Sequence, residues 1–463
     1  MIKGRWTKAV WAGLAMLMVA GQAYAAPKKK AKKDDPYKKL EKRKDPDTKK
    51  VYNLKGIDIV IADWWSNPDR EPSSSAEEDQ RAFRNWLQKT YNFTMVQKSI
   101  GGWGTHPTTV ANFCTTGGDE NYIFIVDGRS IGAGLKANLF YDLSSIKAVN
   151  WSDKKWDQAT KVKSSKGLHF YGMRAEAPEP RGGVFFNKRL LQEANIDPDY
   201  IYDLQKEGKW TWETFEDICR KITRDTDNDG VPDIYAMSSL STEFSHLALM
   251  SNGGAWIARD KNGKLYNDTN SENSMEALNW IRHMVQNYEL PSPEGASWDY
   301  MYTEFANGNV AFLVDQEYNA QPGGRFSEMK DDFGFVCFPL GPKGDGKYKT
   351  LHDDNMYVIP ACYDKDRAES LAKAYDLWSD TVPGYEGQET WKESYYACFR
   401  DTRAVDETLT LMHDNPNPRF DTLVAGFNVG SFVWNFWAGA ATAQEQYETT
   451  KNAWQALIDD ANR

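Results

Sequence analysis

Apolar and polar positions alternate in several short runs between residues 56 and 463. The first run, GIDIVIADWW at residues 56–65, alternates isoleucine with other residues and ends abruptly at two tryptophans. Period-two alternation predicts a β-strand; a helix-length segment at 76–90 and a second strand at 94–99 follow it. A third strand is expected at 121–127, again before a helix. Strands that alternate with helices in this way are typical of α/β proteins.

The segment 167–191 changes from strand to loop and back to strand. An aromatic run at 168–173 precedes a charged, proline-rich loop at 174–181, and an apolar run at 183–186 follows it. Asn187 is a favourable N-cap residue, so a helix is expected to begin there. One strand that leaves a compact region and another that enters a new one predict that the chain crosses here between two lobes.

The rest of the chain keeps the same alternation of elements. Thr211 is expected to cap a helix, and the Asn-Gly pair within residues 252–266 predicts a β-hairpin. Apolar residues at helical spacing predict an amphipathic helix at 274–288. Further strands are expected within 305–315, 331–339 and 351–360, and further helices at 366–378 and 443–461.

The first 25 residues have the composition of a secretory signal peptide. A basic start precedes an apolar stretch at 9–20, and small residues surround a cleavage site at Ala25. The apolar stretch is too short to span a membrane as a stable helix. Because no cysteine precedes Cys114, no lipid-modified cysteine can follow the signal. We therefore expect export to a periplasm, cleavage near Ala25, and a protein that is not a lipoprotein.

Residues 26–55 are rich in lysine, aspartate and proline and have almost nothing to bury, which predicts a disordered leader. Either a solvated spacer or a basic tail that touches anionic polymers would fit this composition. The whole chain has 56 basic and 66 acidic residues, of which residues 56–463 hold 40 and 61. A body with a net charge of −21 argues against nucleic-acid binding and suits a neutral or cationic ligand.

The chain has five cysteines, an odd number, so at least one is expected to stay unpaired or to pair with another chain. Cys337 and Cys362 both follow strand-like runs. They could form a disulfide in an oxidising compartment or remain buried thiols. The spacing contains no CxxC pair, so no cysteine metal site is expected.

Aromatic residues stand where the predicted strands end. Trp64 and Trp65 follow Asp63 at the end of the first strand, and Trp103 lies in a glycine-rich loop after the second. Ligands of open α/β sheets bind at the carboxyl ends of strands. Adjacent side chains of an extended segment point to opposite sides, so one of the two tryptophans is expected to face a cleft. Trp256, just before the predicted hairpin, is a further aromatic candidate.

The acidic loop 225–233, DTDNDGVPD, has the spacing of a calcium-binding loop. At its twelfth position Ala236 replaces the usual bidentate glutamate. A metal-free acidic turn is the alternative. Because three carboxylates within five residues repel one another unless neutralised, a structural calcium ion is the preferred interpretation. The expected ligands are Asp225, Asp227, Asp229, the carbonyl group of Val231, and Asp233.

Several motifs occur in an order that resembles one family. They are FFNKRLLQEANID at 185–197, WTWETF at 210–215, FANGNVAFLVD at 305–315 and FPLGP at 338–342. This order is similar to that of family 1 extracellular solute-binding proteins, the maltodextrin-binding-like sugar receptors of ABC importers. The segment at 305–315 is the most specific match, and with further, weaker matches outside these four motifs the resemblance extends over nearly all of residues 56–463.

The resemblance implies a set of ligand contacts. Arg174 and Glu176 would lie on the hinge and face the ligand, and residues directly after the strand at 305–315 would contact it. The positions implied in this way are Asp127, Arg129, Arg174, Glu176, Asp315, Gln316, Glu317, Tyr318, Asp353, Asp354, Asn355 and Trp434. The 18 tryptophans agree with a carbohydrate ligand, because sugar rings stack on aromatic planes and their hydroxyl groups bond to carboxylates, amides and arginines.

We therefore expect a two-lobed α/β fold of the class II periplasmic-binding-protein type, with mixed sheets flanked by helices. The predicted N-terminal lobe comprises residues 56–173 and 351–397, and the C-terminal lobe comprises residues 174–350 and 398–463. Hinge closure around the ligand would be the working motion. The resemblance implies a monomer that captures a carbohydrate, carries out no reaction on it, and delivers it to the permease subunits of an ABC transporter.

Two other functions remain open from the sequence. An exported carbohydrate-active hydrolase could use the carboxylates Glu176 and Glu179, or Ser130 in the G-x-S-x-G sequence at 128–132. A sensor or adhesin ectodomain of the same fold would need no permease. A peptide or polyamine ligand would also suit the acidic body.

Overall fold

The computed structural model describes residues 36–45, 48–175, 179–351 and 355–463. Three residues of the predicted site, Glu176, Asp353 and Asp354, lie outside these ranges. The chain divides into two compact units after Arg43, and the architecture below is that of residues 44–463.

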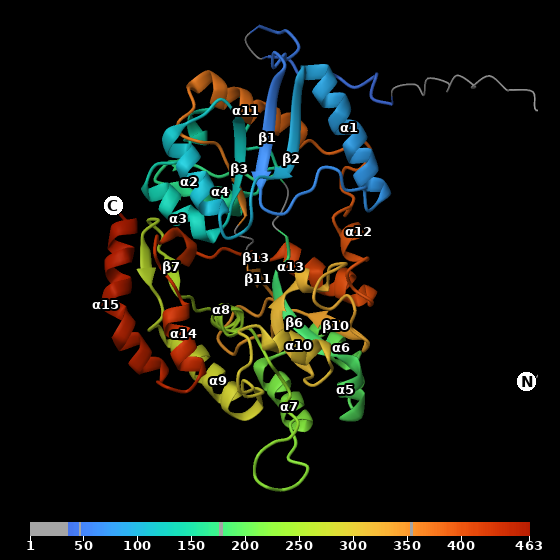
Figure 1. Ribbon diagram of the computed structural model, residues 1–463, viewed down its shortest axis with the longest axis vertical. Coiled ribbons are helices and arrows are strands. Elements are labelled where there is room, and N and C mark those ends of the chain that lie inside the picture. Colours follow the sequence, from blue (N-terminus) through green and yellow to red (C-terminus); the bar gives the residue numbers. More distant parts are fainter. Residues whose placement is uncertain (1–35, 46–47, 176–178, 352–354) are drawn as a thin grey trace, which may run out of the picture. The chain divides into compact units, whose positions relative to one another are not determined.

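A four-stranded sheet with the strand order β12-β3-β1-β2 forms the centre of the N-terminal lobe (Figure 1). β1 (Ile57–Asp63) lies between β2 (Phe93–Ser99) and β3 (Asn121–Val126) and is parallel to both. β12 (Met356–Val358) returns antiparallel beside β3, so the sheet is mixed, as predicted. The carboxyl ends of β1, β2 and β3 therefore meet at one edge, where the loops carrying Trp64, Trp103 and Asp127 begin.

Four main helices flank this sheet. α1 (Ser75–Tyr91) packs against α11 (Lys365–Trp378) beside β2, whereas α2 (His106–Thr116) and α3 (Gly128–Lys136) pack together beside β3. Ser74 caps α1, since its side chain accepts a hydrogen bond from the N–H of Glu77.

The C-terminal lobe has a smaller sheet with the order β10-β6-β9. β6 (Gly182–Asn187) pairs antiparallel with β9 (Phe312–Gln316) and with β10 (Phe333–Val336), and an isolated parallel bridge joins Met237 to Phe312. Every residue of β6 is buried, which explains why its sequence is a continuous run and not an alternation. The helices of this lobe are α5 (Lys188–Glu193), α6 (Tyr200–Lys206), α7 (Trp212–Ile222), α8 (Ser241–Ser251), α9 (Glu272–Tyr288) and α10 (Tyr300–Ala306).

Shorter elements complete the two lobes. The predicted hairpin is present as β7 (Ile257–Arg259) and β8 (Leu265–Asn267), with Gly263 at a positive φ of 83° in its turn. The others are η1 (Leu143–Ser145), α4 (Gln158–Lys163), β4 (Ser165–Lys166), β5 (His169–Phe170), η2 (Glu317–Ala320), β11 (Thr350–Leu351), α12 (Lys392–Tyr395), the π-helix η3 (Ala404–Leu409), α13 (Thr410–Asp414), β13 (Pro416–Asn417), η4 (Asp421–Leu423), α14 (Gly430–Trp437) and α15 (Ala443–Ala461).

The packing places several segments differently from the sequence-based lobe boundaries. Leu54, predicted to belong to a disordered leader, is buried, and its N–H donates to the carbonyl of Tyr91 at 2.8 Å. Tyr395, assigned by sequence to the N-terminal lobe, belongs to the hydrophobic core of the C-terminal lobe. The hairpin residue Leu265, assigned to the C-terminal lobe, packs instead into the core that contains Phe124.

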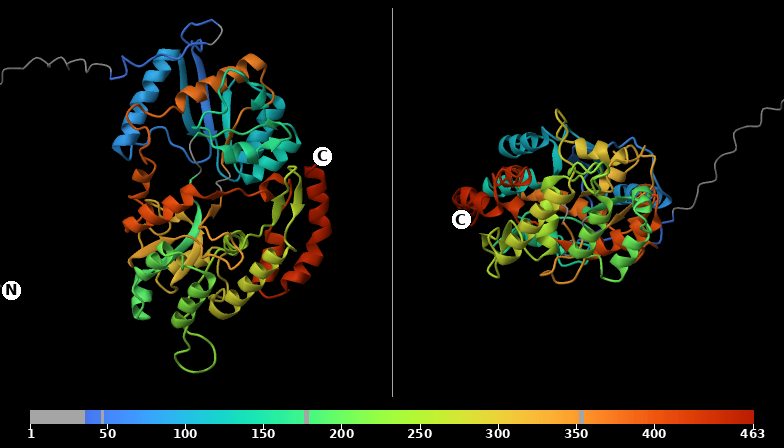
Figure 2. Two further views of the ribbon diagram at one scale, coloured as in Figure 1. Left: turned by 180° about the vertical axis from the view of Figure 1, so that it is seen from behind. Right: turned by 90° about the horizontal axis from the view of Figure 1, so that it is seen from below.

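The helix α15 takes part in both cores. Trp454 packs in the C-terminal core, whereas Ile458, one turn later, packs in the cluster of Phe124 and Ile131. α15 runs along one side of the molecule in Figures 1 and 2, next to the β7–β8 hairpin. Asn462 fastens the two elements, because its side chain bonds to both the N–H and the carbonyl of Leu265 at 2.8 Å.

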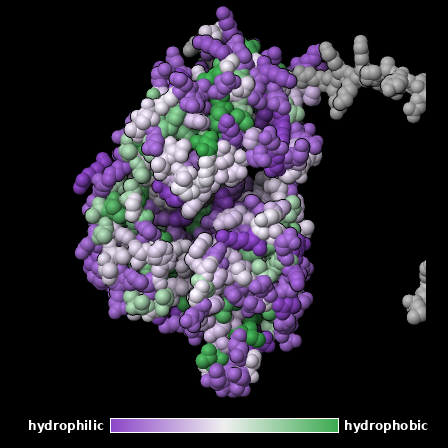
Figure 3. All heavy atoms as spheres, in the orientation of Figure 1, coloured by the Kyte–Doolittle hydropathy of each residue, from purple (hydrophilic) through white to green (hydrophobic). Residues whose placement is uncertain are grey.

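The surface is mainly polar. The face drawn in Figure 3 is largely hydrophilic, with small scattered apolar patches. Across the described residues, no helix combines the length and apolarity that crossing a membrane requires. All five cysteines are free thiols; Cys337 is buried in the C-terminal core and Cys362 is exposed near Phe113 of α2, so the Cys337–Cys362 pairing considered above is not formed.

Candidate ligand cleft

A cavity of about 650 Å³ is lined by residues of both lobes and of the segments that join them. Residues from the carboxyl-end loops of the N-terminal sheet form one wall, and residues that follow β9 form the other. The lining residues are Trp64, Trp65, Trp103, Asp127, Glu179, Arg181, Gln316, Tyr318, Gln321, Leu351, Asn355 and Arg419.

The buried carboxylate of Asp63 shapes the turn after β1. Its Oδ1 accepts hydrogen bonds from the N–H groups of Trp65 and Ser66, and its Oδ2 accepts from the hydroxyl of Ser66 and the amide of Gln97. These bonds hold the two tryptophans in place: the Trp64 ring meets the Trp65 ring edge to face at 4.7 Å. Trp65 remains 51% exposed and faces the cavity.

Asp127 and Arg129 brace the rest of this wall. The Asp127 side chain caps α3 by accepting from the N–H of Arg129 and forms an ion pair of 2.7 Å with the Arg129 guanidinium. That guanidinium stacks 3.7 Å above the Trp103 ring and also donates to the Trp103 carbonyl at 2.8 Å. Trp103 nevertheless stays 60% exposed, so its loop is anchored while much of the ring stays open to solvent.

The opposite wall alternates buried and open side chains along residues 315–318. Asp315 and Glu317 are buried, whereas Gln316 and Tyr318 line the cavity. Asp315 accepts from the hydroxyl of Tyr302 at 2.6 Å and from the amide of Asn319 at 2.9 Å, and burial raises its pKa to about 7. Tyr318 is 40% exposed, and partial burial raises its pKa to about 12, so it stays a neutral phenol.

The crossing segments form the floor through a chain of ion pairs. Arg181 pairs with Glu179 at 2.9 Å and with Glu317 at 3.5 Å, and its N–H donates to the hydroxyl of Thr350 in β11 at 2.8 Å. Arg174 donates to the carbonyl of Asn355 at 3.1 Å. The floor thus ties together chain segments that are about 170 to 180 positions apart in the sequence.

Arg419 completes the lining from the far side of the floor. Its guanidinium makes an ion pair of 2.7 Å with Asp421, whose carboxylate also lies 3.3 Å from Nε2 of His246. Burial alone would raise the pKa of Asp421, but the charge of Arg419 and the bond from His246 hold that pKa well below its usual range.

The sequence of residues 99–375, more than half of the chain, matches the family described as bacterial extracellular solute-binding protein. This chain belongs to that family.

Solved structures with a similar fold include the ABC substrate-binding protein Lmo0181 from Listeria monocytogenes in complex with cycloalternan, at 18% identity and a TM-score of 0.57 over 88% of this chain and 98% of that one. The cyclic alpha-maltosyl-1,6-maltose binding protein from Arthrobacter globiformis has 14% identity and a TM-score of 0.61, over 87% of this chain and 98% of that one. UgpB from Mycobacterium tuberculosis in complex with glycerophosphocholine has 14% sequence identity and a TM-score of 0.60, over 86% of this chain and 98% of that one. These identities show the fold alone. A search of curated proteins found no match.

In this solute-binding protein the predicted site residues divide into three groups. Those that line the cavity are Trp64, Trp65, Trp103, Asp127, Gln316, Tyr318 and Asn355. Those that support the walls from behind are Asp63, Arg129, Asp315 and Glu317. Those that the structure places elsewhere are Arg174, Trp256 and Trp434.

Three corrections follow for the last group. Trp256 is buried against Phe432 and Trp454, so its ring has no face left for a ligand. Trp434 is exposed on α14 but does not line the cavity. The side chain of Arg174 lines a second cavity and bonds to Asn355 from that side.

The second cavity, of about 570 Å³, shares Glu179 with the first and is also rich in aromatic rings. None of the aromatic side chains that line it is exposed: Tyr375, Trp378 and Tyr395 are buried, and Tyr357, Tyr385 and Trp391 are half-buried. In the first cavity Trp65 and Trp103 keep large exposed surfaces. The first cavity is therefore the ligand cleft that the aromatic side chains support.

The sequence did not single out Arg181, Gln321, Leu351 or Arg419, which also line the cleft. Leu351 lies in β11 and Arg419 follows β13, and these two-residue strands are too short to be recognised from a pattern. Glu179 was considered only as a hydrolase acid, and the structure makes it an ion-pair partner of Arg181.

Ser130, the candidate hydrolase nucleophile, is buried in the first turn of α3. Within the described part of the chain its hydroxyl has no hydrogen-bond partner, whereas an activated nucleophile is ordinarily bonded to its general base.

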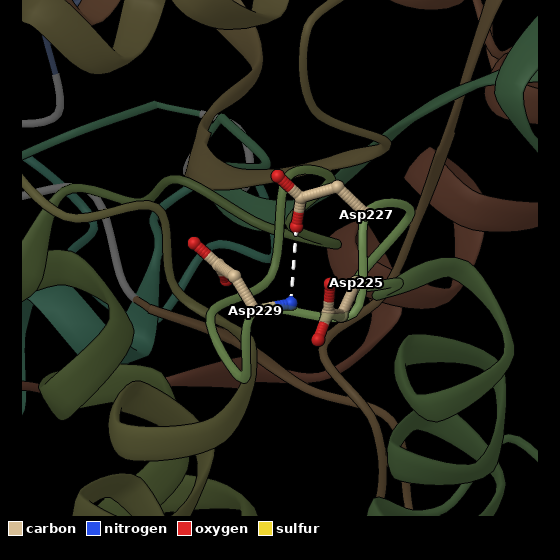
Figure 4. A group of neighbouring side chains, drawn as sticks. All are labelled: Asp225, Asp227 and Asp229. Atoms are coloured by element: carbon tan, nitrogen blue, oxygen red, sulfur yellow. Dashed lines mark hydrogen bonds between the residues drawn. The ribbon is translucent and has the colours of Figure 1, made fainter.

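The acidic loop brings three predicted calcium ligands together. One carboxylate oxygen from each of Asp225, Asp227 and Asp229 lies within 4.8 Å of the others (Figure 4). The Asp225 carboxylate accepts from the N–H groups of Asn228 and Gly230, and Asp227 accepts from the N–H of Asp229 at 3.1 Å. Asp233 accepts instead from Thr226, and Ala236 offers no side-chain oxygen. Three convergent hard oxygen donors fit calcium, with fewer ligands than a full loop supplies.

Proposed function

We propose that this solute-binding protein captures a carbohydrate, specifically an oligosaccharide, in the cleft between its lobes and delivers it to the permease of an ABC transporter. One observation carries the proposal: three aromatic side chains with open surfaces, Trp65, Trp103 and Tyr318, line one cavity together with carboxylate, amide and guanidinium groups. Aromatic planes take the apolar C–H faces of sugar rings, while the polar groups take their hydroxyls.

The similar structures support this choice of ligand class. Lmo0181 was solved with cycloalternan, and the GacH receptor of Streptomyces glaucescens was solved in complex with acarbose. The fold also takes other solutes, since UgpB holds glycerophosphocholine. The aromatic lining of this particular cleft therefore decides the class, and the fold does not.

Membership of the family implies export, and we infer the finer features from the sequence. Residues 1–25 would act as a signal peptide cleaved near Ala25, and the mature protein would be a periplasmic monomer that is not a lipoprotein. Binding without reaction suffices for the function, and the acidic body does not suit nucleic acid.

Calorimetric unfolding in the presence of oligosaccharides tests the proposal. A ligand at 100 times its dissociation constant should add ~2.7 kcal/mol to the free energy of unfolding and raise the midpoint. Trp65→Ala and Trp103→Ala should each weaken binding by roughly 1–2 kcal/mol, because each removes an aromatic plane. Trp298→Ala is the matched control: Trp298 is 72% exposed and does not line the cleft.

Three results would change the proposal. A shift with peptides or polyamines and none with sugars would keep the fold and replace the ligand. Recovery of a cleaved glycan after incubation would mean that the protein is a hydrolase. Equal weakening by Trp298→Ala would show that the tryptophans act through stability and not through contact.

We also propose that the acidic loop 225–233 binds a structural calcium ion through Asp225, Asp227 and Asp229. Calcium should raise the unfolding midpoint of the wild type, because an ion that binds only the folded loop stabilises it. Asp227→Asn should abolish this rise, since the amide keeps the acceptor for the N–H of Asp229 but removes a charge. Glu294→Gln, at an exposed acid of the same lobe, is the control. An equal calcium response in both variants would refute the site.

A further inference from the structure

A buried carboxylate stands directly behind the polar wall of the cleft. Glu243, in the first turn of α8, is 5% exposed. Its Oε2 accepts a hydrogen bond from the side-chain amide of Gln316 at 3.3 Å. Its Oε1 has no hydrogen-bond partner among the described residues, and no lysine, arginine or histidine there lies within 4.0 Å of it to form an ion pair. An uncompensated buried carboxylate is costly, which calls for an explanation of what it does.

The strand next to Glu243 leaves room for this carboxylate. Gly182 of β6 stands opposite Gln316 in the β6–β9 register. A Cβ atom on residue 182 would lie 2.7 Å from Oε1 of Glu243 and 2.8 Å from a methyl carbon of Leu247. Glycine at this position therefore allows the carboxylate to lie beside the strand pair at the point where Gln316 reaches the cleft.

The charge of Glu243 acts on Asp315, which lies behind the same wall of the cleft. After burial itself, it is the largest cause that raises the pKa of the neighbouring Asp315 to about 7. Asp315 and Gln316 have different surroundings, however. The carboxylate of Asp315 is satisfied from within the lobe by Tyr302 and Asn319, whereas Gln316 is partly exposed and lines the cleft.

Glu243 fixes which end of the Gln316 amide faces the ligand. A carboxylate only accepts hydrogen bonds, whereas a glutamine amide donates from nitrogen and accepts at oxygen. The Gln316 nitrogen carries two hydrogens and gives one to Glu243, so the nitrogen end of the amide is turned towards that carboxylate and the carbonyl oxygen is the end left for the cleft. A free glutamine could turn over and serve a donor or an acceptor equally well.

We propose that Glu243 is a positioning residue that makes Gln316 a fixed hydrogen-bond acceptor, so that the ligand must place a donor, a hydroxyl or an ammonium group, against it. A ligand with a carboxylate or phosphate at that point is rejected, because two acceptors face each other and no proton lies between them. The proposal deepens the carbohydrate function above and rests on it. It selects neutral or amino sugars over uronic acids at this part of the cleft.

A double-mutant cycle tests the coupling between the two residues. The probes are maltotetraose as a neutral sugar, chitosan tetramer as an amino sugar of different linkage, and tetragalacturonate as a uronic acid, measured by titration calorimetry. We expect the wild type to bind one of the first two at least ~10-fold more tightly than the uronate. Glu243→Gln and Gln316→Met should each weaken that binding ~10-fold, and the double variant should be no weaker than Gln316→Met alone. Additive losses would overturn the proposal, as would tighter binding of tetragalacturonate.

Glu289→Gln is the matched control. Glu289 is also a buried glutamate of the C-terminal lobe with one oxygen lacking a partner among the described residues, but it accepts from the N–H of Ser239 and does not line the cleft. Its replacement should leave every affinity unchanged. An equal loss in this variant would mean that Glu243 acts through general stability.

A measurement without ligand tests the positioning of Gln316 independently of the proposed carbohydrate function. In NMR spectra of the wild type, the side-chain amide protons of Gln316 should exchange with solvent more slowly than those of Gln321, an exposed glutamine of the same wall. Glu243→Met, which removes both acceptor oxygens, should remove that difference. Equal exchange in the wild type overturns the positioning of Gln316 whatever the ligand is. Slow exchange without binding of any tetramer would instead count against the carbohydrate function.

Discussion

At the scale of single residues, four buried carboxylates fall into two classes, which differ in how many hydrogen-bond donors and cations surround them. Asp63 and Asp421 are surrounded by donors: four hydrogen bonds reach the first, and Arg419 and His246 reach the second. Asp315 and Glu289 receive fewer bonds, and burial raises the pKa of each to about 7 and about 8. Arg419 and His246 lower the pKa of Asp421 and so favour its ionised form, whereas burial favours the protonated forms of Asp315 and Glu289.

Glu289→Gln should change the pH dependence of stability. The pKa of Glu289 is about 8 in the folded protein against 4.5 ordinarily, so the folded state holds its proton more tightly than the unfolded state. Below pH 4.5 Glu289 is protonated in both states and does not lower the stability of the wild type. As the pH rises towards 8, the free energy of unfolding of the wild type falls. The glutamine variant, which cannot ionise, should gain up to roughly 5 kcal/mol relative to the wild type over this range.

Urea unfolding at a series of pH values measures this difference. The Ser239 N–H keeps its acceptor in the variant, so the fold itself should be preserved. Stability curves of the two proteins that run parallel from pH 4 to pH 9 would contradict the assignment of a protonated Glu289.

The residue scale also shows which part of the site the sequence could predict. Trp64 and Trp65 were predicted because they stand at the carboxyl end of a parallel strand, where ligands bind, whereas Asp127 was implied by the family resemblance. Asp315 and Glu317 were expected in the cleft, yet alternation along the chain turns them inwards and turns Gln316 and Tyr318 outwards. A sequence gives the alternation but not its phase, which the packing of β9 on β6 decides.

At the scale of elements, strongly patterned segments were predicted well and weakly patterned ones were not. The strands β1 and β3 and the hairpin have alternation or a turn signal strong enough to be recognised. The two-residue strands β11 and β13 have neither, although they pair in the floor of the cleft. The placement of the β7–β8 hairpin against the N-terminal core depends on tertiary contacts that no local pattern contains.

Gly132→Ala tests one close approach between elements. A Cβ atom at this helical position would lie 2.8 Å from the backbone carbonyl of Leu423 in η4 and 2.9 Å from the N–H nitrogen of Ala425. Alanine ordinarily stabilises a helix by ~1 kcal/mol over glycine. Here we expect a net loss of roughly 1–3 kcal/mol, because backbone cannot move aside as a side chain can.

Chemical denaturation measures this loss, and Gly104→Ala is the control because an added Cβ there meets nothing within 4 Å. A stabilised Gly132→Ala protein would show that α3 and η4 are not in firm contact.

At the scale of the whole molecule, the segments around Arg174, Arg181 and Asn355 join two separately packed lobes, and the cleft lies where they meet. A ligand that contacts both walls shifts the population towards the state in which both walls reach it. Small-angle scattering should therefore show a smaller radius of gyration with a bound oligosaccharide. The Trp65→Ala variant at the same sugar concentration should show less compaction. An unchanged radius at saturation would mean that binding and lobe movement are not linked.

The tryptophans of the cleft give the protein a built-in optical signal. Indole emission depends on the polarity around the ring, and Trp65 and Trp103 are largely open to water while the Trp64 ring lies 5.0 Å from that of His106. A sugar that displaces water from the two open rings would move their emission to shorter wavelengths. Tryptophans away from the cleft, such as the buried Trp210 and Trp256, would contribute a constant background. The protein could thus serve as its own label-free sensor for the solute it carries.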